Sequence, residues 1–177
     1  MIDAQQKFVF AGNMGAGKTT AIAAISGGDT LRMEVPLPEH EHQGDKTTTT
    51  VGFDFGIVSL GGTPLYLYGT PGQEHFHIVA GEIMTGAVGV VLLINAATRR
   101  IEADLDAWIE VIHGAAARVP VVIAVNRPEP QTPSIQDLRR QCRARSSAIV
   151  AVQIADPRRR IDMMSCLRVL TLAHLRG

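Results

Sequence analysis

The segment Gly12–Thr19 constrains the fold of this chain more than any other part of the sequence. It reads Gly-Asn-Met-Gly-Ala-Gly-Lys-Thr and fits the pattern G-x-x-x-x-G-K-[ST] of a phosphate-binding loop. Residues 7–11 before it predict a short buried strand, and residues 20–25 after it predict a helix that residues 27–28 would end. A strand, a glycine turn and a helix aim backbone N–H groups and the positive end of the helix dipole at one point. That point suits the phosphates of a nucleotide.

Two side chains of this loop carry specific expectations. Lys18 would reach the β/γ oxygens of a nucleotide, and the Thr19 hydroxyl would ligate Mg²⁺. The alternative is a chance glycine-rich turn ahead of a helix, and the correct order of strand, loop and helix argues against it.

Composition and charge narrow the class of protein. The 177 residues, 46% of them apolar, suit one domain, residues 1–177, with a proper core. Acidic and basic residues balance at 17 each, so a broad basic face for nucleic acid or acidic lipid is not indicated. The sequence shows no signal peptide, membrane-length apolar run or lipidation motif. We therefore expect a soluble cytoplasmic protein with no nucleic-acid partner and no direct membrane anchor.

The rest of the chain alternates predicted strands and helices. Residues 54–60 and 63–68 flank Gly61-Gly62 and predict an antiparallel hairpin. Further buried strands are predicted at 87–95, 120–126 and 147–154, and helices at 74–85, 101–117, 134–144 and 159–175. Six strands and five helices in this order predict a doubly wound α/β sheet, mostly parallel with one antiparallel strand. Its ligands would bind at the carboxyl ends of the strands.

Several conspicuous features are expected to be structural. Residues 29–50 are polar and proline-containing, and predict a long loop that is functional or mobile. Within it Glu39–His42 is expected to be solvated, since a flexible segment fixes no ligand geometry for a metal. Cys142 and Cys166 lack metal-binding spacing and should be buried, reduced thiols. Trp108 lies on the apolar face of a predicted helix and should point into the core.

Five segments together resemble a Ras-type small GTPase, and the resemblance spans nearly the whole chain. They are the phosphate loop Gly12–Thr19, a switch I-like segment Thr50–Phe55, a switch II-like segment Gly69–Glu74, a base-reading segment Asn126–Glu129 and a last base-contacting loop Ala155-Asp156. The sequence around the switch segments is most similar to a prokaryotic branch that includes the small GTPases of actinobacterial conservons and the MglA polarity GTPases. Members of that branch often work beside roadblock-type dimeric proteins.

The resemblance implies a guanine-nucleotide switch with slow, Mg²⁺-dependent GTP hydrolysis and a regulatory protein partner, with the roadblock type as the candidate that it suggests. Gln73 would be catalytic and orient the attacking water. Thr19 and Thr50 would ligate Mg²⁺, with Thr50 arriving only when a γ-phosphate is present, and the Gly72 N–H would bind that phosphate. The residues implied in binding GTP or GDP are Asn13, Met14, Gly15, Ala16, Gly17, Lys18, Thr19, Thr20, Thr50, Gly72, Asn126, Arg127, Glu129, Ala155 and Asp156.

Departures from the family pattern concern the metal, the hydrolysis and the base. Gly69 replaces the acidic residue that holds Mg²⁺ through water in most relatives, and neither Asp54 nor Glu74 has the expected position in the sequence to replace it. Met14 stands where Ras has a glycine facing the γ-phosphate, so turnover should be slow. Glu129 replaces an aspartate and adds a methylene, so guanine preference should be blunted, unless Asp156 reads the base edge.

Charged side chains near these segments receive less specific expectations. Arg32 lies well before Thr50 in the sequence, so an arginine supplied in trans by a partner is the expected source of charge for hydrolysis. His75 and His77 should be surface or partly packed residues, with a pH-sensing or metal role as the alternative. Arg158–Arg160 should be the solvated start of the last helix.

Two other functions remain open from the sequence. A P-loop kinase usually needs an arginine-rich lid, and the polar segment 29–50 is poor in arginine. A scaffold that binds nucleotide permanently, or not at all, is kept open by Gly69, Met14 and Glu129.

Overall fold

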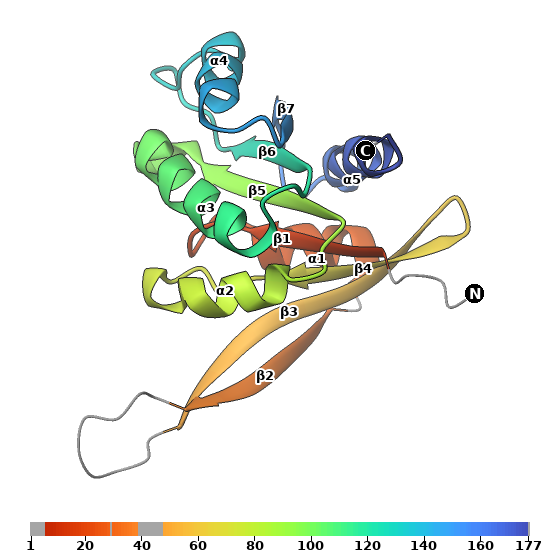
Figure 1. Ribbon diagram of the computed structural model, residues 1–177. Coiled ribbons are helices and arrows are strands. Elements are labelled where there is room, and N and C mark those ends of the chain that lie inside the picture. The colour runs from red at the N-terminus through yellow and green to blue at the C-terminus, as the bar shows by residue number, and fades with distance from the viewer. Residues whose placement is uncertain (1–5, 29, 39–47, 177) are drawn as a thin grey trace, which may run out of the picture.

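The computed structural model describes residues 6–28, 30–38 and 48–176, which form one twisted, seven-stranded sheet with helices on both faces (Figure 1). The strand order is β2-β3-β4-β1-β5-β6-β7. The strands are β1 (Gln6–Ala11), β2 (Leu31–Pro38), β3 (Thr48–Leu60), β4 (Thr63–Gly69), β5 (Gly89–Asn95), β6 (Val121–Asn126) and β7 (Ile149–Ile154). Within the described part of the chain, β3 runs in the direction opposite to that of the other six strands. The predicted class, a mostly parallel α/β sheet with one antiparallel strand, is confirmed.

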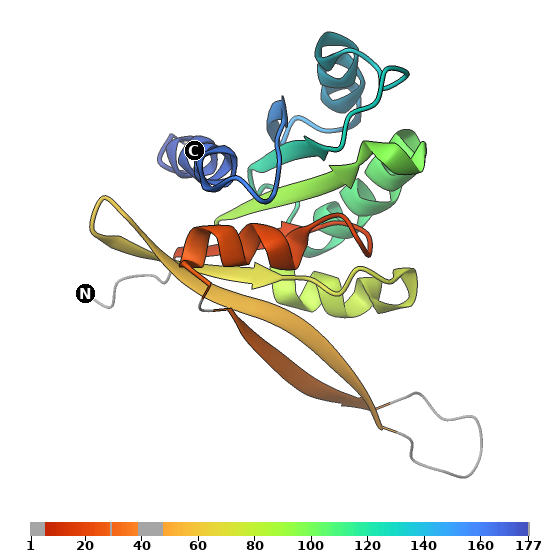
Figure 2. The ribbon, with the colours of Figure 1, turned by 180° about the vertical axis from the view of Figure 1, so that it is seen from behind.

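Among the described residues, five α-helices surround the sheet, in the number and order predicted. They are α1 (Lys18–Ser26), α2 (His77–Met84), α3 (Ile101–Ala116), α4 (Ile135–Arg145) and α5 (Arg160–His174), and 3-10 turns precede α2 (η1, Glu74–Phe76) and α3 (η2, Ala96–Thr98). Figures 1 and 2 show α2, α3 and α4 over one face, and α1 and α5 over the other.

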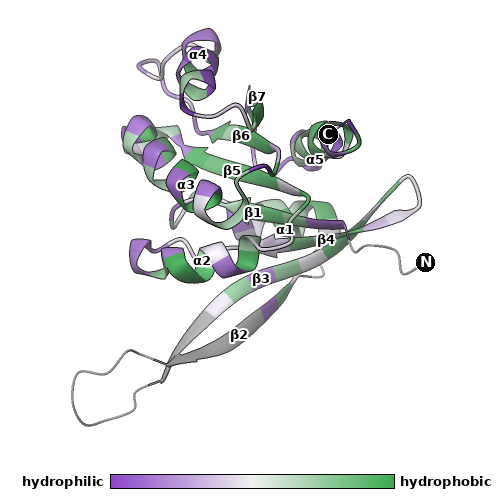
Figure 3. Cartoon of the chain, in the orientation of Figure 1, coloured by the Kyte–Doolittle hydropathy of each residue, from purple (hydrophilic) through white to green (hydrophobic). Residues whose placement is uncertain are grey.

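Two apolar clusters, one on each face of the sheet, form the core. Alternation along β1 sends Val9 to one cluster and both Phe8 and Phe10 to the other, as expected for a strand covered on both faces. Trp108 of α3 packs in the first cluster and Ile22 of α1 in the second. Figure 3 shows the result, with apolar central strands and polar outer helix surfaces.

The structure corrects one prediction about the sheet, which has seven strands where six were expected. Residues 31–38 form β2, and β3 begins at Thr48, so much of the segment 29–50 is a hairpin and not a loop. Pro36 and Pro38 suggested a loop, but β2 is an edge strand, where a missing backbone donor is tolerated. The stretch Glu39–His42 lies outside the described residues.

Other expectations about buried groups are confirmed. Cys142 and Cys166 are buried and free, and burial raises the pKa of the Cys166 thiol to about 12. Trp108 is fully buried. None of the helices described has the length and apolar character needed to cross a membrane.

Candidate functional site

The phosphate loop leaves β1 at the carboxyl edge of the sheet and enters α1, as the sequence predicts. Three of its glycines, Gly12, Gly15 and Gly17, have φ angles of 137°, 77° and 106°, a region that side-chain-bearing residues rarely adopt. Gly17 immediately precedes α1, which has no side-chain cap at its N-terminus. The first N–H groups of the helix therefore remain directed at the loop's concave side.

The Lys18 side chain is held over this loop by backbone carbonyl groups of the loop itself. It is only 8% exposed, and its Nζ donates to the carbonyl oxygens of Gly12 at 2.7 Å and Asn13 at 2.9 Å. Burial lowers the pKa of Lys18 to about 8, and the nearby carboxylate of Asp54 opposes this shift. The ammonium group is thus placed and partly desolvated where an anion would stabilise its charge.

A cavity of about 570 Å³ opens beside the loop. Its lining residues are Met14, Gly15, Gly17, Lys18, Thr19, Thr20, Thr30, Arg32, Gly52, Asp54, Thr70, Pro71, Gly72 and Arg127. Eight of the residues expected to bind nucleotide are thus on its wall, Gly72 and Arg127 among them, while the Asn13 carbonyl accepts a hydrogen bond from Lys18 Nζ. The hydroxyls of Thr30 and Thr70 are buried without a hydrogen-bond partner among the described residues.

The donor set of this cavity fits Mg²⁺. Thr19 and Thr70 contribute hydroxyl oxygens and Asp54 contributes a carboxylate, and oxygen ligands are those that Mg²⁺ prefers. Thr50 pairs with Pro36 in the β2–β3 hairpin, and its side chain is outside the described part of the structure, so its role as a ligand stays a prediction.

The switch II-like segment lies directly against the phosphate loop. The Met14 N–H donates to the Gly72 carbonyl at 3.0 Å. A Cβ at position 72 would lie 2.5 Å from the Met14 nitrogen and 2.6 Å from Lys18 Nζ, so this approach requires glycine. Gln73 follows on the exposed side and is not among the described residues that line the cavity. The structure therefore brings Gly72, but not Gln73, to the phosphate cavity.

Two charged residues that the sequence placed outside the site lie within it. Asp54 accepts a hydrogen bond from Thr19 Oγ1 at 2.5 Å, which corrects the expectation that its sequence position excludes it from the metal region. Arg32, on β2, lines the same cavity, although it lies far from the switch segments in sequence. Both placements come from the β2–β3 hairpin, in which Arg32 pairs with Asp54.

Asn126 and Asp156 line a second, smaller cavity, of about 160 Å³, where the base-reading segments meet. The lining residues are Gly17, Thr20, Asn126, Arg127, Asp156, Pro157 and Arg158. Asn126 is 5% exposed and its Nδ2 donates to the Ala16 carbonyl at 3.3 Å, which ties the end of β6 to the phosphate loop. Arg127 lines both cavities and has a φ of 50°.

Each acidic residue expected to read a base contacts an arginine. Glu129 lies 3.9 Å from Arg99 and contacts Gln131, and it is not among the described residues that line either cavity. Asp156 binds Arg158, and these hydrogen bonds hold the pKa of Asp156 at about 2. Ala155 is buried, and its N–H donates to the Val125 carbonyl at 3.0 Å. The structure thus assembles Asn126 and Asp156 at this cavity and leaves Glu129 outside.

The two histidines and Arg158–Arg160 are exposed or partly packed. His75 is exposed, and His77 packs its ring 4.8 Å from that of Trp108. Arg159 lies 3.7 Å from Asp162, and Arg160, where α5 begins, donates to the Ile25 carbonyl.

Trp108 is a contact to the loop that sequence reasoning missed. Its Nε1 donates to Asn13 Oδ1 at 2.7 Å, so α3 braces the phosphate loop from below. The helical spacing of apolar residues predicts a buried tryptophan, but not which polar atom its N–H reaches.

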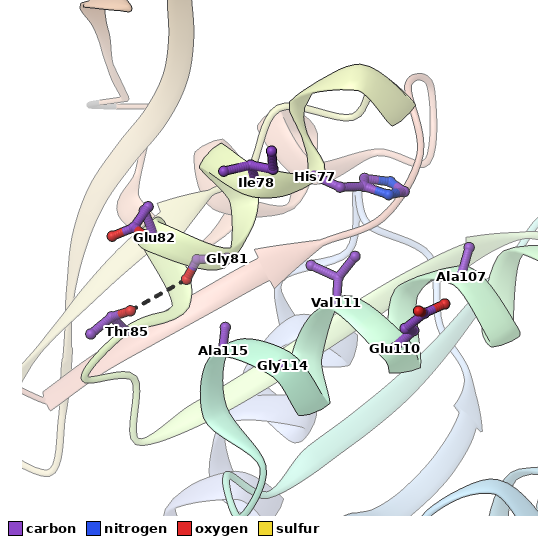
Figure 4. Close-up of a pocket in the computed structure, with 10 residues that line it drawn as sticks. All are labelled: His77, Ile78, Gly81, Glu82, Thr85, Ala107, Glu110, Val111, Gly114 and Ala115. Carbon is purple, nitrogen blue, oxygen red and sulfur yellow. Dashed lines mark hydrogen bonds between the residues drawn. The ribbon is translucent and has the colours of Figure 1, made fainter.

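A further hollow of about 570 Å³ lies between α2 and α3 (Figure 4). Its walls include Ile78, Glu82, Glu110 and Val111, and none of the residues predicted to bind nucleotide lines it.

Comparison with known proteins points to the same superfamily as the motifs. No protein-family model matches the chain. It is 28% identical over 128 residues to "Probable Ras-related protein Rab-4A" of Echinococcus multilocularis, which covers 70% of this chain and 52% of that protein. It is 27% identical over 128 residues to "Ras and EF-hand domain-containing protein homolog" of Mus musculus, covering 70% and 18% of the two chains. It is 31% identical over 123 residues to "Ras-related protein Rab-40A-like" of Homo sapiens, covering 68% and 40%.

The matched region spans about half of these relatives or less. They give no support to the expected prokaryotic branch or to a roadblock-type partner. The similarity at the level of the Ras-like superfamily is supported, and the phosphate loop, the adjoining glycine of the switch II-like segment and the sheet agree with it.

Proposed function

We propose that this chain is a guanine-nucleotide switch that hydrolyses GTP slowly with Mg²⁺ and acts in the cytoplasm by binding a regulatory protein partner in one nucleotide state. The observation that carries the proposal is the contact between the phosphate loop and the switch II-like segment, Met14 N–H to Gly72 carbonyl at 3.0 Å. The similarity to Ras-related proteins supports the choice of guanine nucleotides.

In this proposal the chain's own groups bind the phosphates. The α1 N-terminus and the loop amides after Gly15 present N–H donors, and Lys18 adds a partly desolvated ammonium group. Mg²⁺, when bound, would neutralise charge on the phosphate oxygens. Thr19 lines the cavity and would hold it, and Thr50 joins Thr19 in the proposal as the ligand from the switch I-like segment.

The Met14–Gly72 contact supports a conformational response to the third phosphate. The Gly72 backbone occupies the space next to Lys18 Nζ and uses one loop N–H. A terminal phosphate competing for these donors would require Gly72 to turn its own N–H toward the anion. A local change in charge would thereby reposition the whole segment, as in order–disorder switches.

The proposed slow turnover rests on the placement of Gln73 and Met14. Gln73 is exposed and is not among the described residues that line the cavity, so in the proposal it moves before it orients water. Met14 is 75% exposed at the cavity wall, where its side chain would obstruct the approach of a partner's arginine. Arg32 already lines the cavity, so the proposal allows charge from this chain as well as from a partner.

The test is single-turnover GTP hydrolysis by the wild type, Gln73→Ala and a matched surface variant, Gln136→Ala. We expect Gln73→Ala to slow the chemical step about a hundredfold, on the scale of losing one positioned general base or water-orienting group, and Gln136→Ala to leave it unchanged. An equal rate in all three proteins would show that Gln73 does not orient the attacking water. Nucleotide extracted from the purified protein should be GDP or GTP, and finding ATP would contradict the guanine assignment.

A scaffold that binds nucleotide without hydrolysing it is the second candidate. The observation that favours it is the position of Gln73 outside the cavity. It predicts bound nucleotide and no single turnover in the wild type, which separates it from a switch.

A further inference from the structure

We propose that Asp54 supplies the carboxylate of the Mg²⁺ site, from strand β3, in place of the acidic residue that position 69 lacks. The inference rests on the proposed nucleotide-binding function. On this proposal the glycine at position 69 does not mean that the acidic group is lost, because the neighbouring strand carries it.

The register of the sheet places the two positions side by side. Asp54 of β3 pairs directly with Gly69 of β4. A Cβ built on Gly69 would lie 3.2 Å from the Asp54 Cβ and 3.2 Å from its Oδ2. The Asp54 carboxylate therefore fills the space into which a side chain at 69 would project. An acid at 54 and a glycine at 69 are geometrically complementary.

The packing of α1 against β3 brings the metal-binding hydroxyl to this carboxylate. A Cβ at Gly56, two residues along the same face as Asp54, would lie 2.7 Å from Ile22 Cγ2 and 3.1 Å from Ser26 Cβ. Because position 56 carries no side chain, α1 lies directly on the strand. Thr19, in the first turn of α1, consequently reaches Asp54 Oδ2 at 2.5 Å.

No other carboxylate competes for this role within the described wall of the cavity. Asp54 is the one acidic residue among the described residues that line it. Glu74, the other candidate near the switch II-like segment, is exposed and lies 3.8 Å from Arg100 of the segment before α3. The charge of Asp54 is also felt at the phosphate site, where it raises the pKa of Lys18 against the effect of burial.

A carboxylate on a paired strand has a functional consequence. When the acidic residue belongs to switch II, movement of that segment also moves a group that holds the metal. Asp54 is fixed by pairing on both sides, to Arg32 in β2 and to Gly69 in β4. Mg²⁺ retention should therefore be independent of where Gly72 and Gln73 lie.

The experiment measures release of a fluorescent GDP analogue across free Mg²⁺ concentrations, with excess EDTA as the metal-free limit. In the wild type Mg²⁺ should slow release. In Asp54→Ala and Asp54→Asn the concentration of Mg²⁺ needed should rise about 10- to 100-fold, the usual effect of losing a group that supports a metal ligand, while release in EDTA stays unchanged. Asp106→Ala, which removes an exposed carboxylate that pairs with Arg145, is the matched control and should behave as wild type.

The relocation itself is tested by Asp54→Ala combined with Gly69→Asp. Removing the Asp54 carboxylate clears space at position 69, and the new acid should restore Mg²⁺ dependence to within about tenfold of wild type. Asp54→Asn that folds by circular dichroism and keeps the wild-type Mg²⁺ response would overturn the inference, whatever the double variant does. A wild-type protein that binds no guanine nucleotide in either condition would instead contradict the proposed function.

Discussion

The phosphate side and the base side of the site are built in different ways. Around the phosphate loop, backbone groups and side chains are joined by close hydrogen bonds. Lys18 donates to two loop carbonyls, the Met14 N–H to the Gly72 carbonyl and the Thr19 hydroxyl to the Asp54 carboxylate. On the base side, Asn126 is buried and tied to the loop by a hydrogen bond, while Glu129 contacts Arg99 and Gln131 outside the cavity.

The difference shows which part of nucleotide recognition depends on a local pattern. Phosphate recognition uses main-chain geometry set by glycine spacing and a helix start, so a short motif specifies it. Base recognition uses single side chains on loops whose directions depend on neighbours such as Arg99 and Arg158. We therefore expect strong dependence of affinity on the phosphates and weak dependence on the base.

The largest expected effect comes from Lys18→Ala. It removes a buried ammonium from the phosphate side, and hydrogen bonds to charged groups contribute about 1.5–3 kcal/mol each, so GDP affinity should fall at least about a hundredfold. Calorimetric titration with Mg²⁺ and GDP measures it. Lys7→Ala, at the other end of β1 with its Nζ on the Thr85 carbonyl, is the control. A Lys18→Ala protein that keeps wild-type affinity would show that the loop is not the binding site.

Gly72→Ala comes next. A methyl group there would collide with the Met14 nitrogen and Lys18 Nζ and force the switch II-like segment off the loop. We expect affinity for a non-hydrolysable GTP analogue to drop about tenfold, the loss of one hydrogen bond to a charged group, with GDP affinity little changed. Emission from Trp108, the one tryptophan of the chain, reports occupancy because its N–H binds Asn13. Equal losses of affinity for both nucleotides would show that Gly72 does not respond to the third phosphate.

The pH dependence should also belong to the phosphate side. The free protein holds the pKa of Lys18 at about 8, below its ordinary value, so Lys18 is neutral above that pH. Bound phosphate favours the ammonium form, so binding above pH 8 takes up a proton and weakens as pH rises. GDP affinity should fall about tenfold from pH 7 to pH 9, the range in which one group of this pKa titrates. Unchanged calorimetric affinity over that range would contradict the desolvated state of Lys18.

The smallest effects are expected on the base side. Asn126→Ala removes the bond to Ala16 and should weaken GDP binding about fivefold, the scale of one neutral hydrogen bond. Glu129→Gln should change GDP affinity and the preference for GDP over ADP by less than about twofold, since the side chain is outside the cavity. Competition titrations with both nucleotides measure these differences. Loss of guanine preference in Glu129→Gln would show that this carboxylate does read the base.

The contrast also explains what the sequence could and could not predict. The phosphate loop, the buried strands and the five helices follow from glycine spacing and apolar periodicity, which are local. The strand β2 was missed because Pro36 and Pro38 suggest a loop, and only pairing with β3 shows that they lie on an edge strand.

Long-range register produced the other surprises. Asp54 reaches Thr19 because β3 pairs with β4 in one register and because Gly56 admits α1, and neither fact is readable from residues 54 or 69 alone. Trp108 and Asn13 are 95 positions apart, so their bond has no sequence signature. The pairing of Glu129 with Arg99 likewise depends on how two loops meet.

Calorimetric titration of the wild-type protein with GDP and with a non-hydrolysable GTP analogue, in the presence of Mg²⁺, addresses the central claim most directly. Saturable one-site uptake of both nucleotides, lost in Lys18→Ala, is the result we predict. Folded wild-type protein that takes up neither nucleotide would contradict the account.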